Sequence, residues 1–127
     1  MFYFGSGAEF GKSRRIADVK EENFGEIVPK DAYGLGKYIM NEHCLHSNNI
    51  YNLRLFGTIN PFERYTKNVI SNMCVKAMFG FPINLRQDCR FSFIDMDDVT
   101  DMLNQAIHMD LKYHDYNMVG RQSYLLS

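Results

Sequence analysis

The stretch IYNLRLF, residues 50–56, is the best starting point for the fold. Its branched and aromatic side chains are typical of a β-strand, and Asn60-Pro61 ends the run. An amphipathic helix is predicted on each side of it, over residues 33–47 and over residues 63–78. The apolar residues that share a face are Leu35, Ile39, Met40 and Cys44 in the first helix and Val69, Ile70, Met73, Cys74 and Ala77 in the second. A strand between two helices is typical of an α/β sheet.

The N-terminal quarter of the chain predicts one further strand and a loop. Residues 1–4 are an apolar run that stops at Gly5-Ser6-Gly7, which indicates a strand buried on both faces. Residues 12–31 are polar, contain Gly25 and Pro29, and show no sustained apolar period. We therefore expect a surface loop between the first strand and the first helix.

The C-terminal part of the chain continues the alternation. Residues 90–94 and 116–119 are predicted as two short strands. The helix between them has Asp97 or Asp98 as its N-cap and carries the apolar residues Val99, Met102, Leu103, Ala106 and Ile107. Strands and helices therefore alternate along the whole chain, which predicts an α/β fold with parallel strands and right-handed crossovers.

Composition excludes several classes of protein. The chain has 127 residues, 46% of them hydrophobic, and a net charge of −1, which suits one globular domain. It has no basic arm for nucleic acid and no apolar run near the ~20 residues of a membrane span, so we expect neither partner. Cys44, Cys74 and Cys89 are an odd set without a CxxC pair. They predict free thiols in a reducing compartment, and hence a cytoplasmic protein.

Two further patterns imitate binding sites. Gly5, Gly7 and Gly11 follow a strand, as in a dinucleotide fingerprint, but that motif requires a helix N-terminus immediately afterwards. Lys12-Ser13-Arg14-Arg15 and a polar stretch follow instead, so we interpret the glycines as a decoy. His43 and His46 could share a metal, but no third ligand has zinc-type spacing. No metal site is predicted.

Tyr33 and Lys37 are four residues apart and share one face of the first predicted helix. An ammonium beside a phenol favours the phenolate, which makes a tyrosine a usable general base. The spacing alone is a weak signal, because a solvated helix face produces the same pair.

Five segments, in order along the chain, resemble the extended short-chain dehydrogenase/reductase family, the NAD-dependent sugar-nucleotide epimerases and dehydratases. They are Gly5-Ser6-Gly7-Ala8-Glu9-Phe10-Gly11, the YxxxK pair Tyr33 and Lys37, LRLFG at 53–57 with Asn60-Pro61, FIDMDDV at 93–99 and YNMVG at 116–120. The resemblance implies a partial Rossmann-type, doubly wound parallel sheet with part of a substrate-binding subdomain. Residues 1–127 would then be a single domain: the C-terminal part of an NAD(P)-binding domain plus a fragment of that subdomain, without the GxxGxxG half.

The same resemblance implies roles for four residues. Ser6, Tyr33 and Lys37 would be catalytic, with Tyr33 exchanging the hydroxyl proton and Ser6 orienting the same substrate oxygen. Tyr33 and Lys37 would also contact the cofactor, NAD or NADP. Ser6 and Arg90 would contact the substrate, a nucleotide sugar. The implied parent enzyme is an NAD(P)-dependent epimerase or ketoreductase.

Departures from the family pattern narrow this reaction and leave alternatives open. Gly7 and Ala8 stand where the 4,6-dehydratases carry an Asp-Glu pair, and Ala8 also stands where GDP-fucose-type reductases place a Cys; both chemistries are disfavoured. We expect no cofactor on this chain alone, no turnover by it, and association into a homo-oligomer. The alternatives are a non-catalytic truncated remnant and a self-associating binding module in which Tyr33 and Lys37 are surface residues.

Overall fold

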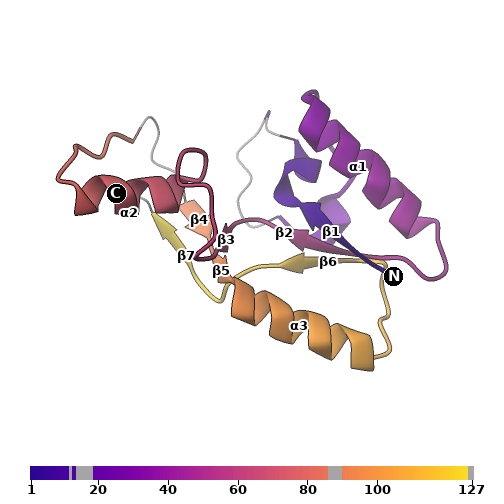
Figure 1. The fold of residues 1–127 in the computed structure, drawn as a ribbon. Helices are drawn as coiled ribbons and strands as arrows, with labels where there is room; N and C mark the ends of the chain where they lie inside the picture. Colours follow the sequence, from indigo (N-terminus) through magenta and orange to yellow (C-terminus); the bar gives the residue numbers. More distant parts are fainter. Residues whose placement is uncertain (12, 14–18, 86–89, 126–127) are drawn as a thin grey trace.

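The computed structural model describes residues 1–11, 13, 19–85 and 90–125. Its elements alternate as the sequence predicts, with short 3-10 helices (η) added (Figure 1). In chain order they are β1 (Phe2–Ser6), η1 (Gly7–Phe10), η2 (Glu21–Asn23), α1 (Ala32–Leu45), β2 (Tyr51–Leu55), β3 (Thr58–Ile59), α2 (Val69–Met78), β4 (Arg90–Ser92), β5 (Ile94–Asp95), α3 (Met96–His108), β6 (Asp115–Met118) and β7 (Ser123–Leu125).

The centre of the fold is a sheet with the strand order β1-β2-β6. All three strands are parallel, with Gly5 opposite Arg54 and Arg54 opposite Asn117. Helix α1 connects β1 to β2 and lies on one face of the sheet, while α3 precedes β6 and lies on the other (Figure 1). The prediction of an α/β fold with a parallel sheet is confirmed.

The two faces of this sheet differ in chemistry. On the α3 side, Leu53 and Met118 pack with Val99 and Ile94 to form the apolar core. On the α1 side, the alternating residues of the same strands are polar, and the side chains of Asn52 and Arg54 are completely buried. Parallel strands covered by helices are usually apolar on both faces, so a charged inner face is unusual.

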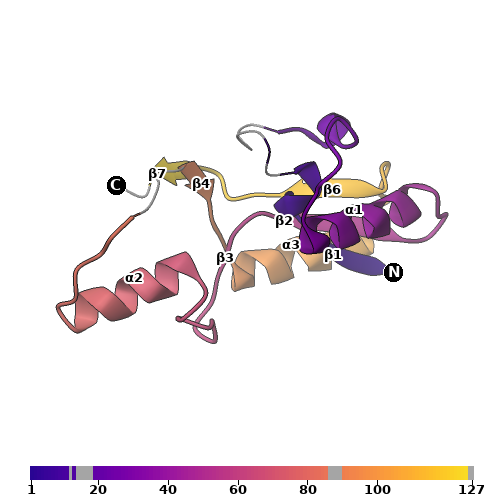
Figure 2. The same ribbon diagram turned by 90° about the horizontal axis from the view of Figure 1, so that it is seen from above.

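A smaller part lies beside the sheet and contains α2 and two strand pairs. Strand β3 pairs with β5 in parallel, and β4 pairs with β7 antiparallel. Figures 1 and 2 both show α2 set apart from the sheet and its helices. Consistent with that position, none of the residues of α2 is buried.

Two expectations about helix starts are wrong. The helix predicted over residues 63–78 begins at Val69, because Arg64 O accepts from the N–H groups of Lys67 and Asn68 in a turn before it. Helix α3 is capped by Asp95, whose Oδ1 accepts from Asp97 N at 2.8 Å, rather than by Asp97 or Asp98. In both cases the local hydrogen bonds determine where the helix begins.

Two expectations about strands are also corrected. Residues 90–94 form not one strand but two, β4 and β5, which pair with different partners on either side of Phe93. Strand β1 is not buried on both faces. Among the described strands it pairs with β2 alone, and its residue Phe4 is 39% exposed. No helix among the described residues has the length and apolar character needed to cross a membrane.

Candidate functional site

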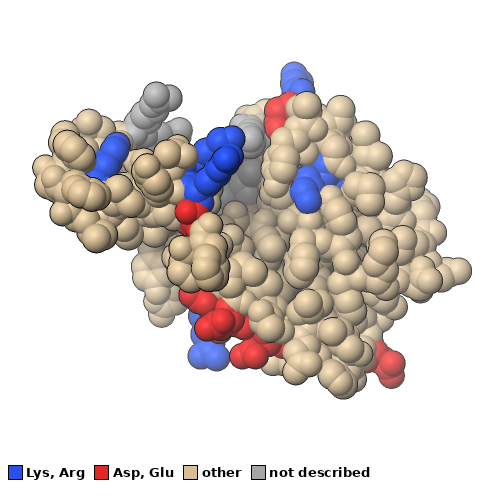
Figure 3. Space-filling model, in the orientation of Figure 1, with Lys and Arg blue, Asp and Glu red and all other residues tan. Residues whose placement is uncertain are grey.

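A cavity of about 530 Å³ opens where β1 and β2 end. Its walls come from the carboxyl end of β1, the first turns of α1, the end of β2 with the residues after it, and the segment that leads into α2. Figure 3 shows the molecule hollowed between the α2 part and the sheet, with Lys and Arg side chains beside the hollow. Open α/β sheets bind ligands at the carboxyl ends of their strands, so the cavity has the expected location for a site.

Ser6 reaches this cavity because it is both the last residue of β1 and the N-cap of η1. Its Oγ accepts from Ala8 N at 3.2 Å, and its own N–H donates to Glu9 Oε1 at 2.9 Å. This reciprocal pair is a capping box, which the Ser-x-x-Glu spacing of the sequence encodes. The residue before it must be glycine, because a Cβ at Gly5 would lie 2.2 Å from Asn52 Oδ1.

Tyr33 and Lys37 line the same cavity from the first turns of α1. The helix begins at Ala32 because Asp31 Oδ1 accepts from Gly34 N at 3.0 Å. A Cβ at Gly34 would lie 2.9 Å from Ala8 O, so glycine allows this end of α1 to close on η1 beside Ser6. Tyr33 is exposed to solvent. Lys37 Nζ, in contrast, donates to Phe4 O at 2.7 Å and lies 4.6 Å from the centre of the Tyr3 ring.

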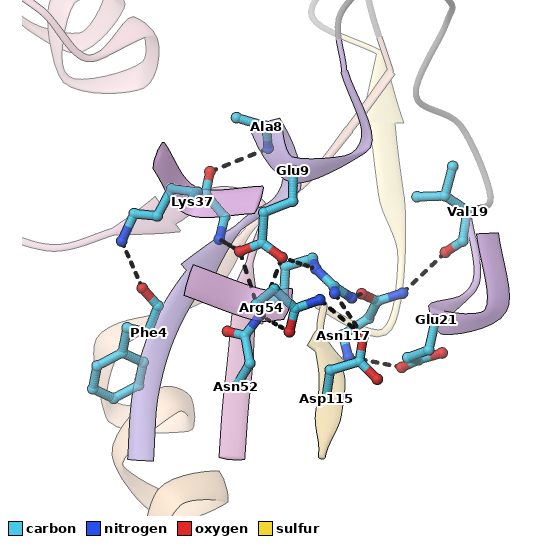
Figure 4. A network of polar contacts seen from close by, with 12 residues as sticks. Phe4, Ala8, Glu9, Val19, Glu21, Lys37, Asn52, Arg54, Asp115 and Asn117 are labelled. Carbon is cyan, nitrogen blue, oxygen red and sulfur yellow. Dashed lines mark hydrogen bonds and ion pairs between the residues drawn. The ribbon is translucent and has the colours of Figure 1, made fainter. Parts of the chain in front are cut away.

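Beneath the cavity, the polar face of the sheet carries a buried ion-pair cluster centred on Arg54 (Figure 4). Arg54 Nε donates to Glu9 Oε2 at 2.8 Å, and Nη2 donates to Asp115 Oδ2 at 2.7 Å. Asn52 Nδ2 donates to Glu9 Oε2 at 3.1 Å and to Asn41 Oδ1 at 2.8 Å. The cluster therefore joins η1, α1, β2 and β6.

Residues 19–24, which precede α1, contact this cluster. Asn117 Oδ1 accepts from Arg54 Nη1 at 2.7 Å, and Asn117 Nδ2 donates to Val19 O at 3.1 Å. The Arg54 guanidinium carbon lies 4.6 Å from the centre of the Phe10 ring and 5.6 Å from that of Phe24. Aromatic faces are good neighbours for a buried guanidinium, so these contacts anchor this segment to the sheet.

One buried thiol lies near the same charges. Cys44 on α1 is free and fully buried. Burial raises the pKa of the Cys44 thiol, and the carboxylates of Glu9 and Asp115 raise it further. Cys74 is free and exposed, and Cys89 lies outside the described residues.

The structure brings together three of the four predicted site residues. Ser6, Tyr33 and Lys37 line one cavity, although Ser6 lies 27 residues before Tyr33 in the sequence. Arg90 does not line it: it is exposed at the start of β4, where Nη1 donates to Ser123 O at 3.0 Å. Its contact with substrate stays a prediction.

The glycine pattern of residues 5–11 does not begin an α-helix. It forms the four-residue η1, and among the described residues the next α-helix begins only at Ala32. Lys12, Arg14 and Arg15 lie outside the described residues.

Sequence reasoning missed the ion-pair cluster. The available signal was the alternation of polar residues in two strands, Asn52 and Arg54 in β2 and Asp115 and Asn117 in β6. Period-two alternation places such residues on one face of a sheet, so a shared polar face was inferable. The sequence did not, however, indicate that this polar face is buried.

The family of the chain follows from comparison with known proteins. The model of the NAD dependent epimerase/dehydratase family matches residues 1–118. The chain belongs to this family. Membership of the NAD dependent epimerase/dehydratase family confirms the resemblance on which the Rossmann-type fold was predicted. A comparison with curated protein sequences finds no significant match.

Three solved structures illustrate the likeness in fold. A GDP-L-fucose synthetase from Naegleria fowleri gives a TM-score of 0.82 at 12% identity, over 98% of this chain and 48% of that one. A UDP-glucuronic acid 4-epimerase from Bacillus cereus, in complex with NAD, gives 0.73 at 17% identity, over 98% and 41%. A GDP-mannoheptose C4 reductase from Campylobacter jejuni, with NADP bound, gives 0.66 at 15% identity, over 97% and 52%. The chain thus spans about half the length of the structures it matches.

Proposed function

We propose that Ser6, Tyr33 and Lys37 are the catalytic residues of an NAD(P)-dependent epimerase or ketoreductase that acts on a nucleotide sugar. The observation that carries this proposal is that all three line one cavity at the carboxyl ends of parallel strands, in a chain of the epimerase/dehydratase family. Structural neighbours named for GDP- and UDP-sugar enzymes support the substrate class. The activity belongs to a protein that also supplies a glycine-rich dinucleotide turn.

The donors in the cavity suit the nicotinamide end of the cofactor. Lys37 uses one ammonium N–H on Phe4 O, which leaves two for the hydroxyls of a ribose. The accessible Tyr33 hydroxyl is a second candidate contact to the cofactor. When bound, the nicotinamide supplies or accepts the hydride.

The residues of the chain itself handle the proton. In the direction of reduction, Tyr33 gives its hydroxyl proton to the substrate carbonyl oxygen and becomes a phenolate; in oxidation, the phenolate removes the proton of the substrate hydroxyl. Lys37 holds the cofactor through the N–H groups that its bond to Phe4 O leaves free. The Ser6 hydroxyl donates to the same substrate oxygen and orients it. Gly7 and Ala8 offer no titratable side chain beside Ser6, so dehydration is not part of the proposal.

Replacing Tyr33 by Phe tests this assignment. In a full-length version of the enzyme, Tyr33→Phe should lower kcat by about 10²-fold or more, because the phenol acts on the proton in the transition state. The affinity for the cofactor, measured by NADPH or NADH fluorescence titration, should fall by no more than about fivefold, because Lys37 keeps its contacts to the ribose after the Tyr33 hydroxyl is lost. Tyr113→Phe is the matched control, since Tyr113 is as exposed as Tyr33 and does not line the cavity. A Tyr33→Phe variant with kcat within a few-fold of wild type would contradict the role.

A further inference from the structure

Glu9 is a completely buried carboxylate that the proposed chemistry does not use. It does not line the cavity, but it belongs to η1, the turn whose N-cap, Ser6, does. Buried charges are rarely the most stable solution for a core, since apolar residues of similar volume often serve as well. The location of Glu9 directly beneath a predicted catalytic serine suggests a use other than stability.

The contacts of Glu9 connect Ser6 to the ion-pair cluster. Oε1 accepts from Ser6 N at 2.9 Å, while Oε2 accepts from Arg54 Nε at 2.8 Å and from Asn52 Nδ2 at 3.1 Å (Figure 4). Two buried donors, Arg54 Nε and Asn52 Nδ2, therefore fix the carboxylate, and the carboxylate in turn binds the backbone N–H of Ser6.

The same turn determines how the Ser6 hydroxyl can be used. Its Oγ accepts from Ala8 N at 3.2 Å, which commits one acceptor position of the hydroxyl to the protein. The O–H remains available to donate, and Ser6 lines the cavity. A donor is what a substrate carbonyl or hydroxyl oxygen requires at this position.

We propose that Glu9 is the positioning residue for Ser6: its carboxylate, locked by Arg54 and Asn52, fixes the turn that presents the Ser6 O–H to the cavity. The proposal rests on the proposed function insofar as that O–H meets the substrate. Glu9 itself touches neither substrate nor cofactor, and acts through Ser6 alone.

The donors around Glu9 explain why a carboxylate is needed rather than an amide. An ordinary capping box accepts Glu or Gln at this position. Here Ser6 N, Arg54 Nε and Asn52 Nδ2 all donate, and they address both oxygens. A glutamine would turn its NH2 group toward at least one of these donors, so one contact must break.

The test uses the conservative variant Glu9→Gln and reads Ser6 by NMR on the chain itself. In the wild type, the Hα–Hβ couplings of Ser6 should report a single χ1 rotamer, and its amide should exchange slowly with solvent. In Glu9→Gln, we expect averaged couplings and amide exchange about tenfold faster or more. Glu22→Gln is the matched control, because the Glu22 side chain is exposed and, within the described part of the chain, forms an ion pair with Lys20 alone, at 3.8 Å. It should change neither readout.

Kinetics on a full-length version then separate positioning from a general structural effect. If Glu9 acts through Ser6, Glu9→Gln should lower kcat about tenfold in the wild-type background and less than twofold in the Ser6→Ala background. An equal loss in both backgrounds would overturn the proposal, and so would Ser6 couplings that are unchanged by Glu9→Gln. If Glu9→Gln does not fold, the wild-type measurement still decides: a Ser6 side chain already averaged over rotamers would overturn it. A full-length protein without turnover on any nucleotide sugar would refute the proposed function alone, because the Ser6 readouts need no substrate.

Discussion

Replacing Arg54 by methionine should cost this fold a large part of its stability. The Arg54 side chain is completely buried and makes ion pairs of 2.8 Å to Glu9 and 2.7 Å to Asp115. Methionine fills a similar length of the space between the Phe10 and Phe24 rings but brings no charge. Arg54→Met therefore leaves two buried carboxylates without their cation.

The magnitude follows from the cost of such unpaired charges. Removing one partner of a buried ion pair costs about 3–5 kcal/mol, because the remaining charge cannot be solvated. The free energy of unfolding of a domain of this size is about 5–15 kcal/mol. Arg54→Met should therefore remove at least about a fifth of the stability, and it should unfold the chain if the wild-type stability lies at the lower end of that range.

Urea unfolding followed by circular dichroism measures this loss. Arg90→Met is the matched control, because the exposed Arg90 side chain bonds to Ser123 alone among the described residues. It should change the stability by less than about 0.5 kcal/mol. A loss below about 1 kcal/mol at neutral pH would refute the reasoning.

Three further predictions follow from features of the fold. Gly34→Ala should destabilise the chain by about 1–2 kcal/mol in urea unfolding, since its Cβ would lie 2.9 Å from Ala8 O. Gly36→Ala on the same helix is the control: its Cβ would have no atom within 4 Å, so it should stabilise the chain by about 0.5–1 kcal/mol. A gain in stability at both positions would contradict the close approach of α1 to η1. The raised pKa of Cys44 favours the neutral thiol in the folded state, so the contribution of Cys44 to stability is full below about pH 8.5 and is lost as the pH rises through the folded-state pKa. Between about pH 8 and pH 10, the free energy of unfolding should therefore fall more steeply with pH in wild type than in Cys44→Ala. Equal dependence on pH in the two proteins would exclude this contribution. The chain on its own should self-associate through the unpaired edge of β1, and a monomer at every concentration in sedimentation velocity would exclude this.

Much of the sheet and its helices could be predicted from local patterns. The existence of α1 and β2 could be predicted, and their ends lie within about two residues of the predicted ones. The apolar face predicted for α1 is only partly correct, because Cys44 is buried but Leu35, Ile39 and Met40 are exposed. The start of α2 could not be predicted in this way, because a turn hydrogen-bonded to Arg64 O precedes Val69 and carries no periodic signal. The edge position of β1 also depends on what pairs with it, which an apolar run does not specify.

The candidate site was predictable where residues follow strand ends and helix starts. Ser6 is the last residue of β1 and Tyr33 lies in the first turn of α1, and the topology of a parallel sheet brings such positions together. The cluster beneath it was not predictable, because Arg54 meets carboxylates that are 45 and 61 residues away in the chain. No local pattern identifies a partner at that separation.

The charged inner face also determines how β1 and β2 can align. Side chains alternate between the faces of a sheet, so sliding β2 by one residue would turn Arg54 into the apolar core and place Leu53 between Glu9 and Asp115. A one-residue shift between two apolar faces would cost little free energy, but this shift would leave three buried charges without partners. The observed register, in which Ser6 lies opposite Leu55, is thus the alignment that keeps every charge paired. The ion pairs thus select the register of the strands, and that register in turn determines where Ser6 lies at the cavity.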